Sequence, residues 1–383
     1  MRLLEKALNL GPDRGDSLTA GLSSASSSGL GPFLGAWPVR PPVANGTLIG
    51  RSRELDTLMH LFGAEQRRLL AVTGIEGVGK TRLALEFARA LHIRHESSIL
   101  WVSLSDEVRP WGKQTAEAAL LSARIRELIH AGPEGARRIG ELIGDRSTLI
   151  ALDGLRTTGA SADVIAQLLA ECPGLRMLIT TRNPAGLAAE SLFPLAPLPV
   201  PDAAHGMEPA RAEEVASVRM LLMQMKQVRP AFELSAGTVA TVVRICGALD
   251  GLPGALEHGA RWSLVYSPQE LARQLEADPL LVATPPAGGE WGTPRLFESV
   301  RRAVLSLTRR QRRLLSVMGR RPGQWSIAEV SASTGLGTAD VMDDMYMLLM
   351  RGLIRRRDEA DQSLFELLNI VRHLHGAAGK GLV

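Results

Sequence analysis

The chain has 383 residues, of which 45% are hydrophobic and 22% are charged. At about 100–200 residues per domain, this length suits two or three domains, and the composition excludes a chain that is disordered throughout. The net charge of +4 is too small to indicate nucleic-acid binding by itself. No run of about 18 apolar residues occurs, so we expect no transmembrane helix and no membrane partner. The first residues place Glu5 and Lys6 inside their apolar stretch, unlike a signal peptide, so we expect a cytoplasmic protein.

Residues 1–45 form the first predicted segment. A small apolar stripe at its start suits one short helix, and the remainder is rich in Gly, Ser and Pro. Such a composition cannot bury enough surface to offset the entropy of ordering, so we expect a flexible linker. The two cysteines of the chain, Cys172 and Cys246, have apolar neighbours and no metal-ligand spacing, which indicates core residues.

Residues 46–200 alternate short apolar runs with longer helical patterns, which is typical of a parallel α/β sheet. The predicted strands are Leu69–Thr73, Ile99–Ser103, Thr148–Leu152, Arg176–Thr180 and a fifth near Ser191–Leu195. A Pro-rich connector follows. We therefore predict an α/β domain with helices on both faces of the sheet.

The strongest motif is Gly74-Ile75-Glu76-Gly77-Val78-Gly79-Lys80-Thr81, which fits the Gly-x4-Gly-Lys-Thr phosphate-binding pattern. A predicted strand precedes it and a helical pattern begins at Arg82, which is the strand–loop–helix setting that this P-loop requires. The glycines let backbone N–H groups turn toward a phosphate, and the helix N-terminus favours an anion. Lys80 would reach the β- and γ-phosphates, and the Thr81 hydroxyl would bind Mg²⁺. The motif predicts a P-loop NTPase.

Two further strand ends carry polar residues that suit nucleotide chemistry. Asp153 follows four apolar residues and would hold Mg²⁺ or its water shell. Arg182 follows a strand and would sense the γ-phosphate. Gly154 stands where many ATPases carry an acid that orients the attacking water, so we expect at most a slow ATPase. No Asn-Lys-x-Asp motif for guanine occurs, which favours adenine.

Residues 201–294 indicate a helical domain followed by a loose linker, Thr284–Pro294. Residues 295–383 suit a winged-helix domain, in which Ser326–Ser333 and Thr338–Met350 form a helix–turn–helix and a short β-ribbon forms the wing. DNA binding through this part is one hypothesis. Acids on its second helix, Asp340, Asp343 and Asp344, would repel phosphates, which favours a regulatory brace within the chain.

The order of these motifs resembles the STAND signalling ATPases, specifically the NB-ARC-like module of bacterial signalling and transcription regulators. The resemblance covers roughly residues 48–375. The segments that carry it are Leu48-Ile49-Gly50-Arg51-Ser52-Arg53-Glu54-Leu55, Gly74–Thr81 with Arg82-Leu83-Ala84, Leu149–Asp153, Thr180-Thr181-Arg182 and Leu249-Asp250-Gly251-Leu252-Pro253-Gly254-Ala255-Leu256.

This resemblance implies a signal-transduction switch in which ADP holds the domains closed and exchange for ATP opens them. It implies an ATP or ADP site with Mg²⁺, and a protein partner or self-oligomer in the ATP state. The implied nucleotide-binding residues are Ile49, Gly50, Arg51, Gly74, Gly77, Val78, Gly79, Lys80, Thr81, Arg82 and Pro253. Catalytic roles would fall to Lys80, Asp153 and Arg182. The C-terminal segment Glu366–Arg372 lacks the histidine that contacts the ADP β-phosphate in some members. The remaining alternative is a DNA-binding transcriptional regulator that acts through the winged helix.

Overall fold

The computed structural model describes most of the chain beyond residue 40. The described residues are 41–42, 46–63, 65, 67–95, 97–104, 116–156, 159–184, 187–188, 191–201, 207–283, 294–320, 322–359 and 362–381. The predicted N-terminal helix and nearly all of the two predicted linkers lie outside them. The chain divides into two compact units. Unit 1 contains Met59–Leu69 and Ala84–Ile179, and unit 2 contains Thr47–Leu58, Leu70–Leu83 and Thr180–Val383. The predicted domain boundaries stay predictions.

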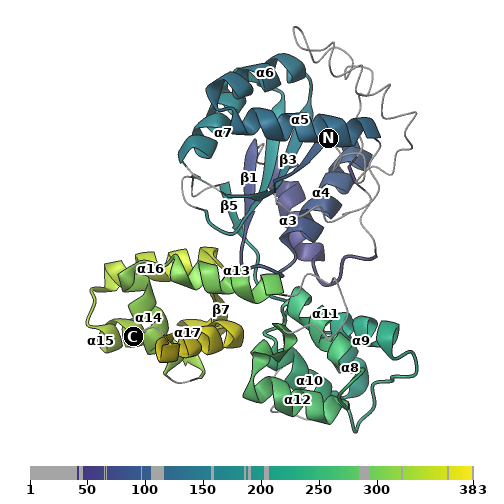
Figure 1. The fold of residues 1–383 in the computed structure, drawn as a ribbon, viewed down its shortest axis with the longest axis vertical. Coiled ribbons are helices and arrows are strands. Elements are labelled where there is room, and N and C mark those ends of the chain that lie inside the picture. Colours follow the sequence, from purple (N-terminus) through teal and green to yellow (C-terminus); the bar gives the residue numbers. More distant parts are fainter. Residues whose placement is uncertain are drawn as a thin grey trace. The chain divides into compact units, whose positions relative to one another are not determined.

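Five strands form a sheet in the order β2-β3-β4-β1-β5 (Figure 1). They are β1 (Leu69–Thr73), β2 (Ser98–Ser103), β3 (Thr148–Leu155), β4 (Leu175–Thr181) and β5 (Leu192–Pro194). In unit 1, β2 pairs with β3 in parallel, and in unit 2, β1 pairs with β5 in parallel. Four strands lie within one residue of their predicted ends, which confirms the predicted parallel α/β sheet.

Strand β3 runs three residues past its predicted end at Leu152. Asp153 lies opposite Ser103 of β2, and the Leu104 N–H donates to the Asp153 carbonyl at 2.8 Å. Pairing with β2 therefore extends the strand, and Asp153 lies inside it. The prediction that the strand ends at Leu152 is wrong, because the strand that extends it by pairing, β2, is distant in sequence.

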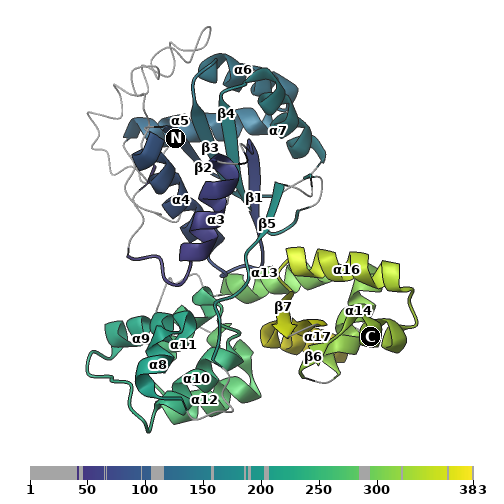
Figure 2. The same ribbon diagram turned by 180° about the vertical axis from the view of Figure 1, so that it is seen from behind.

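The first half of the chain also contains helices (Figures 1 and 2). They are α3 (Ser52–Gly63), α4 (Lys80–His95), α5 (Ala116–His130), α6 (Pro133–Ile143) and α7 (Gly159–Glu171). Within unit 1, α5 packs on β2 and on α6, and α6 packs on α7. Phe62 and Phe87 are both fully buried and meet edge to face with ring centroids 4.9 Å apart. These contacts form the aromatic part of the core of unit 1.

Residues 209–283 of unit 2 are helical, as predicted. The elements are α8 (Pro209–Glu214), α9 (Ala216–Val228), α10 (Val239–Ala248), α11 (Pro253–Trp262), α12 (Pro268–Ala277) and the 3₁₀ helix η3 (Pro279–Ala283). Helix α9 packs on α11, and α10 packs on α12. Val218, Leu222 and Met225 of α9 are buried. Cys246 is buried in the same set of helices, as expected.

The C-terminal part of unit 2 begins with two helices and continues with helices and strands in alternation. The elements are α13 (Pro294–Leu305), α14 (Arg309–Gly319), β6 (Gln324–Trp325), α15 (Ile327–Thr334), α16 (Thr338–Met350), β7 (Ile354–Glu359), β8 (Gln362–Leu367) and α17 (Asn369–Gly381). Strands β6, β8 and β7 form an antiparallel sheet in that order. The predicted helix pair and β-ribbon are present, and the winged-helix assignment itself stays a prediction. Strand β6 and helix α17 were not predicted.

One expectation about α16 is wrong. Asp344 was expected to repel phosphates, yet its side chain is buried, because Arg310 of α14 binds its carboxylate and only 3% of the residue is exposed. On the same helix Met345 and Met350 are buried, whereas Met342 is 52% exposed. The helix turns its Met345 side toward the core, and Met342 lies on another face of the same helix.

Candidate functional site

The phosphate loop Gly74–Thr81 lies in unit 2, between the end of β1 and the start of α4. Gly77 and Gly79 have φ values of 77° and 103°, which residues with a Cβ rarely adopt. The first helical hydrogen bond runs from the Leu83 N–H to the Gly79 carbonyl at 3.0 Å. The amides of residues 80–82 precede that bond, and at this end the helix dipole favours an anion. The chain conformation therefore suits a phosphate group.

Lys80 is buried, with 8% of its surface exposed. Its Nζ donates to the carbonyls of Gly74 and Ile75, both at 2.9 Å. These bonds stabilise a buried ammonium group that would otherwise lose its hydration without compensation. They also keep the positively charged Lys80 Nζ beside the loop. A bound phosphate would compete with the two neutral carbonyls for the hydrogen bonds of this ammonium group, because a charged oxygen is the stronger acceptor.

Arg51, which the resemblance implies as a nucleotide-binding residue, makes three contacts within the protein. Its guanidinium donates to Glu54 Oε1 at 2.7 Å, to the Val78 carbonyl at 3.1 Å and to the Ala196 carbonyl at 2.7 Å. Burial lowers its pKa, and the hydrogen bond to Glu54 opposes this change. Arg51 thus connects the phosphate loop, through the Val78 carbonyl, to the segment after β5, through the Ala196 carbonyl.

Gly50, which the resemblance also implies as a nucleotide-binding residue, lies close to α9. A Cβ on Gly50 would come within 2.2 Å of the Ala216 Cβ, so the backbone approaches α9 closely. Ile49 is half-buried. Their roles in nucleotide binding stay predictions, as does that of Arg82.

The start of α11 rests on the phosphate loop. The Gly254 N–H donates to the Gly77 carbonyl at 2.9 Å, and a Cβ on Gly254 would lie 3.0 Å from the Gly77 Cα. Pro253 Cγ lies 4.0 Å from the Cβ position of Gly79. Pro253, which the resemblance implies as a nucleotide-binding residue, is therefore beside the loop. Gly254 was not among the predicted site residues. Its position directly after Leu252-Pro253 could have indicated that it lies beside the nucleotide site.

Arg182, predicted to sense the γ-phosphate, contacts the loop through a side chain. Its Nη1 donates to Ser299 Oγ of α13 at 2.6 Å and to Glu76 Oε2 at 3.4 Å. The arginine side chain is 40% exposed. Arg182 therefore connects the phosphate loop to α13. Ser299 gives no sequence signal, because nothing local marks a serine in a helix as the partner of a distant arginine.

The turn after α16 also lies against the loop. A Cβ on Gly352 would come within 2.6 Å of the Ile75 N, and Gly352 has a φ of 69°. Next to it, Arg351 donates to Asn183 Oδ1 at 3.4 Å and to Ser306 Oγ at 3.1 Å. Burial lowers the pKa of Arg351. This turn was also missed by sequence reasoning.

Asp153, the predicted Mg²⁺ ligand, belongs to unit 1 and is 4% exposed. The pairing of Asp153 with Thr81 around Mg²⁺ therefore stays a prediction. The donor set fits a magnesium nucleotide, because a hydroxyl and a carboxylate are oxygen ligands, which Mg²⁺ prefers. Across the part of the chain that the structure describes, no group of three or more His, Cys, Asp or Glu side chains could hold a metal ion.

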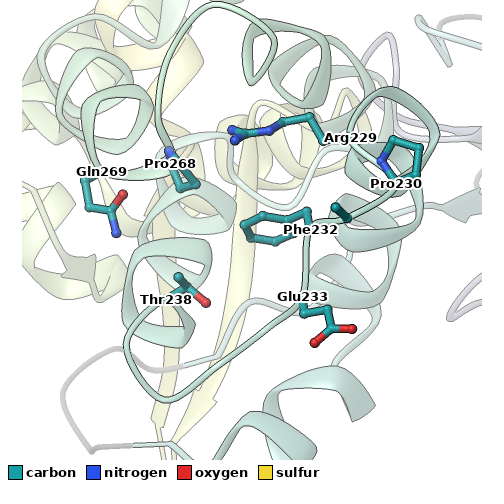
Figure 3. A pocket seen from close by; sticks show the side chains of 8 residues that line it. Arg229, Pro230, Phe232, Glu233, Thr238, Pro268 and Gln269 are labelled. Carbon is teal, nitrogen blue, oxygen red and sulfur yellow. The ribbon is translucent and has the colours of Figure 1, made fainter.

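A separate open hollow of about 590 Å³ lies among the helices of residues 229–269 (Figure 3). Its lining residues are Arg229, Pro230, Ala231, Phe232, Glu233, Thr238, Pro268 and Gln269. It shares no residue with the phosphate loop or with any predicted site position. In the described residues, no helix is both long enough and apolar enough to cross a membrane.

Comparisons with known proteins agree with the geometry of the loop. Residues 53–189 match the NB-ARC domain family. A protein of Mycobacterium tuberculosis named as a candidate HTH-type transcriptional regulator is 27% identical over 315 residues, which are 80% of this chain and 33% of that protein. An uncharacterized protein of the same organism is 29% identical over 239 residues, or 62% of this chain and 56% of that protein. The chain thus spans about a third of the length of the first relative.

A solved structure is also similar. It is a STAND protein with a tetratricopeptide repeat sensor from Pyrococcus horikoshii, at 14% identity, and the match covers 88% of this chain and 43% of that chain with a TM-score of 0.32. The match to the family model over residues 53–189 spans the phosphate loop, Asp153 and Arg182. This part of the chain is therefore similar to the NB-ARC domain family.

Proposed function

We propose that this chain is a signalling switch operated by ADP and ATP at the phosphate loop Gly74–Thr81. The observation that carries the proposal is that three segments far apart in the sequence contact this one loop, through Arg182, Gly254 and Gly352. A ligand shifts a conformational equilibrium only if it interacts differently with the two states. A nucleotide at this loop would meet all three segments and so has the means to do this.

In this proposal, different residues in and around the loop bind the phosphates, Mg²⁺ and adenine. Lys80 would transfer its Nζ from the two loop carbonyls to the β- and γ-phosphates. The backbone amides at the start of α4 would donate to the β-phosphate. Thr81 and Asp153 would hold Mg²⁺, which neutralises phosphate charge. Residues 49–51 and Pro253 would lie at the adenine end.

Arg182 is the residue that would distinguish ATP from ADP. Its Nη1 is held by Ser299 and Glu76, and the side chain remains partly exposed. A γ-phosphate is a stronger acceptor for a guanidinium than a serine hydroxyl. ATP would therefore draw Arg182 away from Ser299 and loosen the contact with α13, whereas ADP would leave that contact in place.

Hydrolysis is the weakest expectation for this site. Gly154 follows Asp153 and has no side chain to orient an attacking water. We propose slow turnover at most, so that the bound nucleotide changes by exchange. The ATP state is proposed to bind a protein partner or further copies of the chain, and light scattering in ADP and in ATP would measure the change in mass.

Calorimetry with Mg²⁺ and ADP or ATP tests the switch. Lys80→Ala removes the charged contact to phosphate, so affinity should fall by about 10- to 100-fold, which corresponds to about 1.5–3 kcal/mol. Lys226→Ala is the matched control, because Lys226 is an exposed lysine on α9 outside the loop. Equal affinities for wild type and Lys80→Ala would contradict the proposal.

DNA binding remains the second candidate, because Arg309, Arg312 and Arg313 are exposed on α14 and a relative is named as an HTH-type regulator. Neutralising these three arginines to Gln should weaken binding and flatten its salt dependence if they contact phosphates. Arg310 must stay, because it binds Asp340 and Asp344. Unchanged DNA affinity in the triple variant would exclude this surface.

A further inference from the structure

Asp250 is a carboxylate buried at a junction that the proposed function does not use. It lies between α10 and α11, is 0% exposed and has a φ of 55°, the one positive φ among the described non-glycine residues. Its Oδ1 accepts from the Asn369 N–H at 2.9 Å, and its Oδ2 accepts from the Ile370 N–H at 3.0 Å. These are the first two amides of α17, so Asp250 caps a helix that begins 119 residues later in the chain.

Residues 250–254, which include Asp250, also form a hydrogen bond to the phosphate loop. The Leu198 N–H donates to the Gly251 carbonyl at 3.0 Å, and the Gly254 N–H donates to the Gly77 carbonyl at 2.9 Å. Only three residues separate Asp250 from Gly254. Hydrogen bonds therefore run from the first turn of α17 through residues 250–254 to the phosphate loop.

A third hydrogen bond supports the same junction from the side of α17. The Asn369 Nδ2 donates to the Gly247 carbonyl at 3.0 Å. Three hydrogen bonds thus attach the start of α17 to the end of α10 and the turn that follows it. A movement of α17 away from this turn would break all three together.

The charges around Asp250 leave its carboxylate incompletely compensated. Arg355 of β7 faces it but donates to Glu366 of β8 at 2.7 Å, and Arg372 of α17 donates to Asn369 Oδ1 at 2.9 Å. Among the described residues, Asp250 makes no salt bridge within 4.0 Å. Burial raises the pKa of Asp250 to about 6, although Arg355 and the two amides act in the opposite direction and Glu366 adds to the rise.

We propose that Asp250 is a latch that couples the docking of α17 to the phosphate loop, so that release of α17 loosens residues 250–254 and weakens nucleotide binding. The proposal rests on the switch function and names an element that regulates it. Asp250 acts through the Gly254 contact and is a positioning residue, because nothing places its carboxylate at the nucleotide.

Hydrogen exchange measured by mass spectrometry on the full chain tests the latch at both ends. Asp250→Asn keeps a residue that tolerates positive φ but replaces one acceptor with a donor facing an N–H. Asn369→Pro acts from the other side, because proline fits the first position of a helix and removes one of the two amide donors. Asp278→Asn is the control, since Asp278 accepts from the Leu280 N–H at 2.9 Å in an exposed turn.

Both latch variants should speed exchange about tenfold in residues 369–375 and also in residues 74–81 and 254–256, with a three- to tenfold loss of ADP affinity. The control should match the wild type. Faster exchange in α17 without a change in the phosphate loop would overturn the coupling, and so would no change in α17. If the wild type binds no ADP, the switch function fails, while exchange in residues 74–81 still tests the latch.

Discussion

At the residue scale, the chemistry of the phosphate loop could be predicted from the sequence, and the contacts of its neighbours could not. Gly77, Gly79 and Lys80 belong to one short motif whose conformation is set locally. The guanidinium of Arg51 binds the carbonyls of Val78 and Ala196, which the sequence does not indicate, and its role in nucleotide binding stays a prediction. An arginine in a sequence shows its charge and donors but not which distant carbonyls will meet it.

Arg51 should therefore matter for stability. Arg51→Met leaves the Val78 and Ala196 carbonyls without their buried donor, and the free energy of unfolding should fall by about 2–3 kcal/mol. Arg53→Met changes an exposed arginine in the same segment and should alter stability by less than about 0.5 kcal/mol. Urea denaturation measures both, and equal midpoints would show that Arg51 is not a brace.

A second prediction at this scale concerns the effect of Gly254 on nucleotide affinity. Gly254→Ala places a Cβ 3.0 Å from the Gly77 Cα, so either α11 or the loop must move. Such crowding costs about 1–3 kcal/mol, and nucleotide affinity should fall at least fivefold. Gly237→Ala is the control, because its Cβ would meet nothing closer than 3.9 Å. Calorimetry that shows equal ADP affinity for the two variants would exclude Gly254 from the site.

At the element scale, the strands β1 to β5 of the parallel sheet were predictable because each is a short, mainly apolar run that the sequence shows directly. Helix α17 was not predicted, because Asp250, which accepts from its first two amides, is far away in the sequence. Helix α15 shows the opposite case. Ser326 and Glu329 form a capping box next to the helix, and its predicted range of Ser326–Ser333 is correct within one residue.

The ion pairs between helices α14 and α16 should contribute to the thermal stability of the protein. Arg310→Ala removes the partner of Asp340 and of Asp344, whose side chain is only 5% exposed. A buried carboxylate that loses its partner is destabilising, so the thermal midpoint should fall. Arg309→Ala removes an exposed arginine next to it and should leave the midpoint unchanged. A midpoint that does not differ between the two variants would contradict a structural role for Arg310.

At the scale of the whole molecule, the sequence predicted the order of the elements but not which of them meet the phosphate loop. Gly352 follows α16 and could be predicted only as a helix-terminating glycine. Its approach to Ile75 depends on how residues 294–381 pack within unit 2, and no local pattern encodes that packing. Contacts of this kind are also what would let a nucleotide control the rest of the molecule.

Gly352→Ala tests that control. The new Cβ would lie 2.6 Å from the Ile75 N and the residue would keep a strained φ, so the turn after α16 should leave the loop. We expect release of a fluorescent ADP analogue to become about tenfold faster. Gly335→Ala carries the same backbone strain, with a φ of 68°, and its Cβ would meet nothing within 4 Å. Equal release rates in the two variants would contradict a closing role for Gly352.

The most direct measurement is to purify the protein without added nucleotide, denature it and identify the released small molecules by ion-exchange chromatography. A switch that rests in its ADP state should release close to one ADP per chain, and Lys80→Ala should release almost none. Wild-type protein that carries no adenine nucleotide and also fails to bind Mg²⁺ with ADP or ATP would contradict a nucleotide site at residues 74–81.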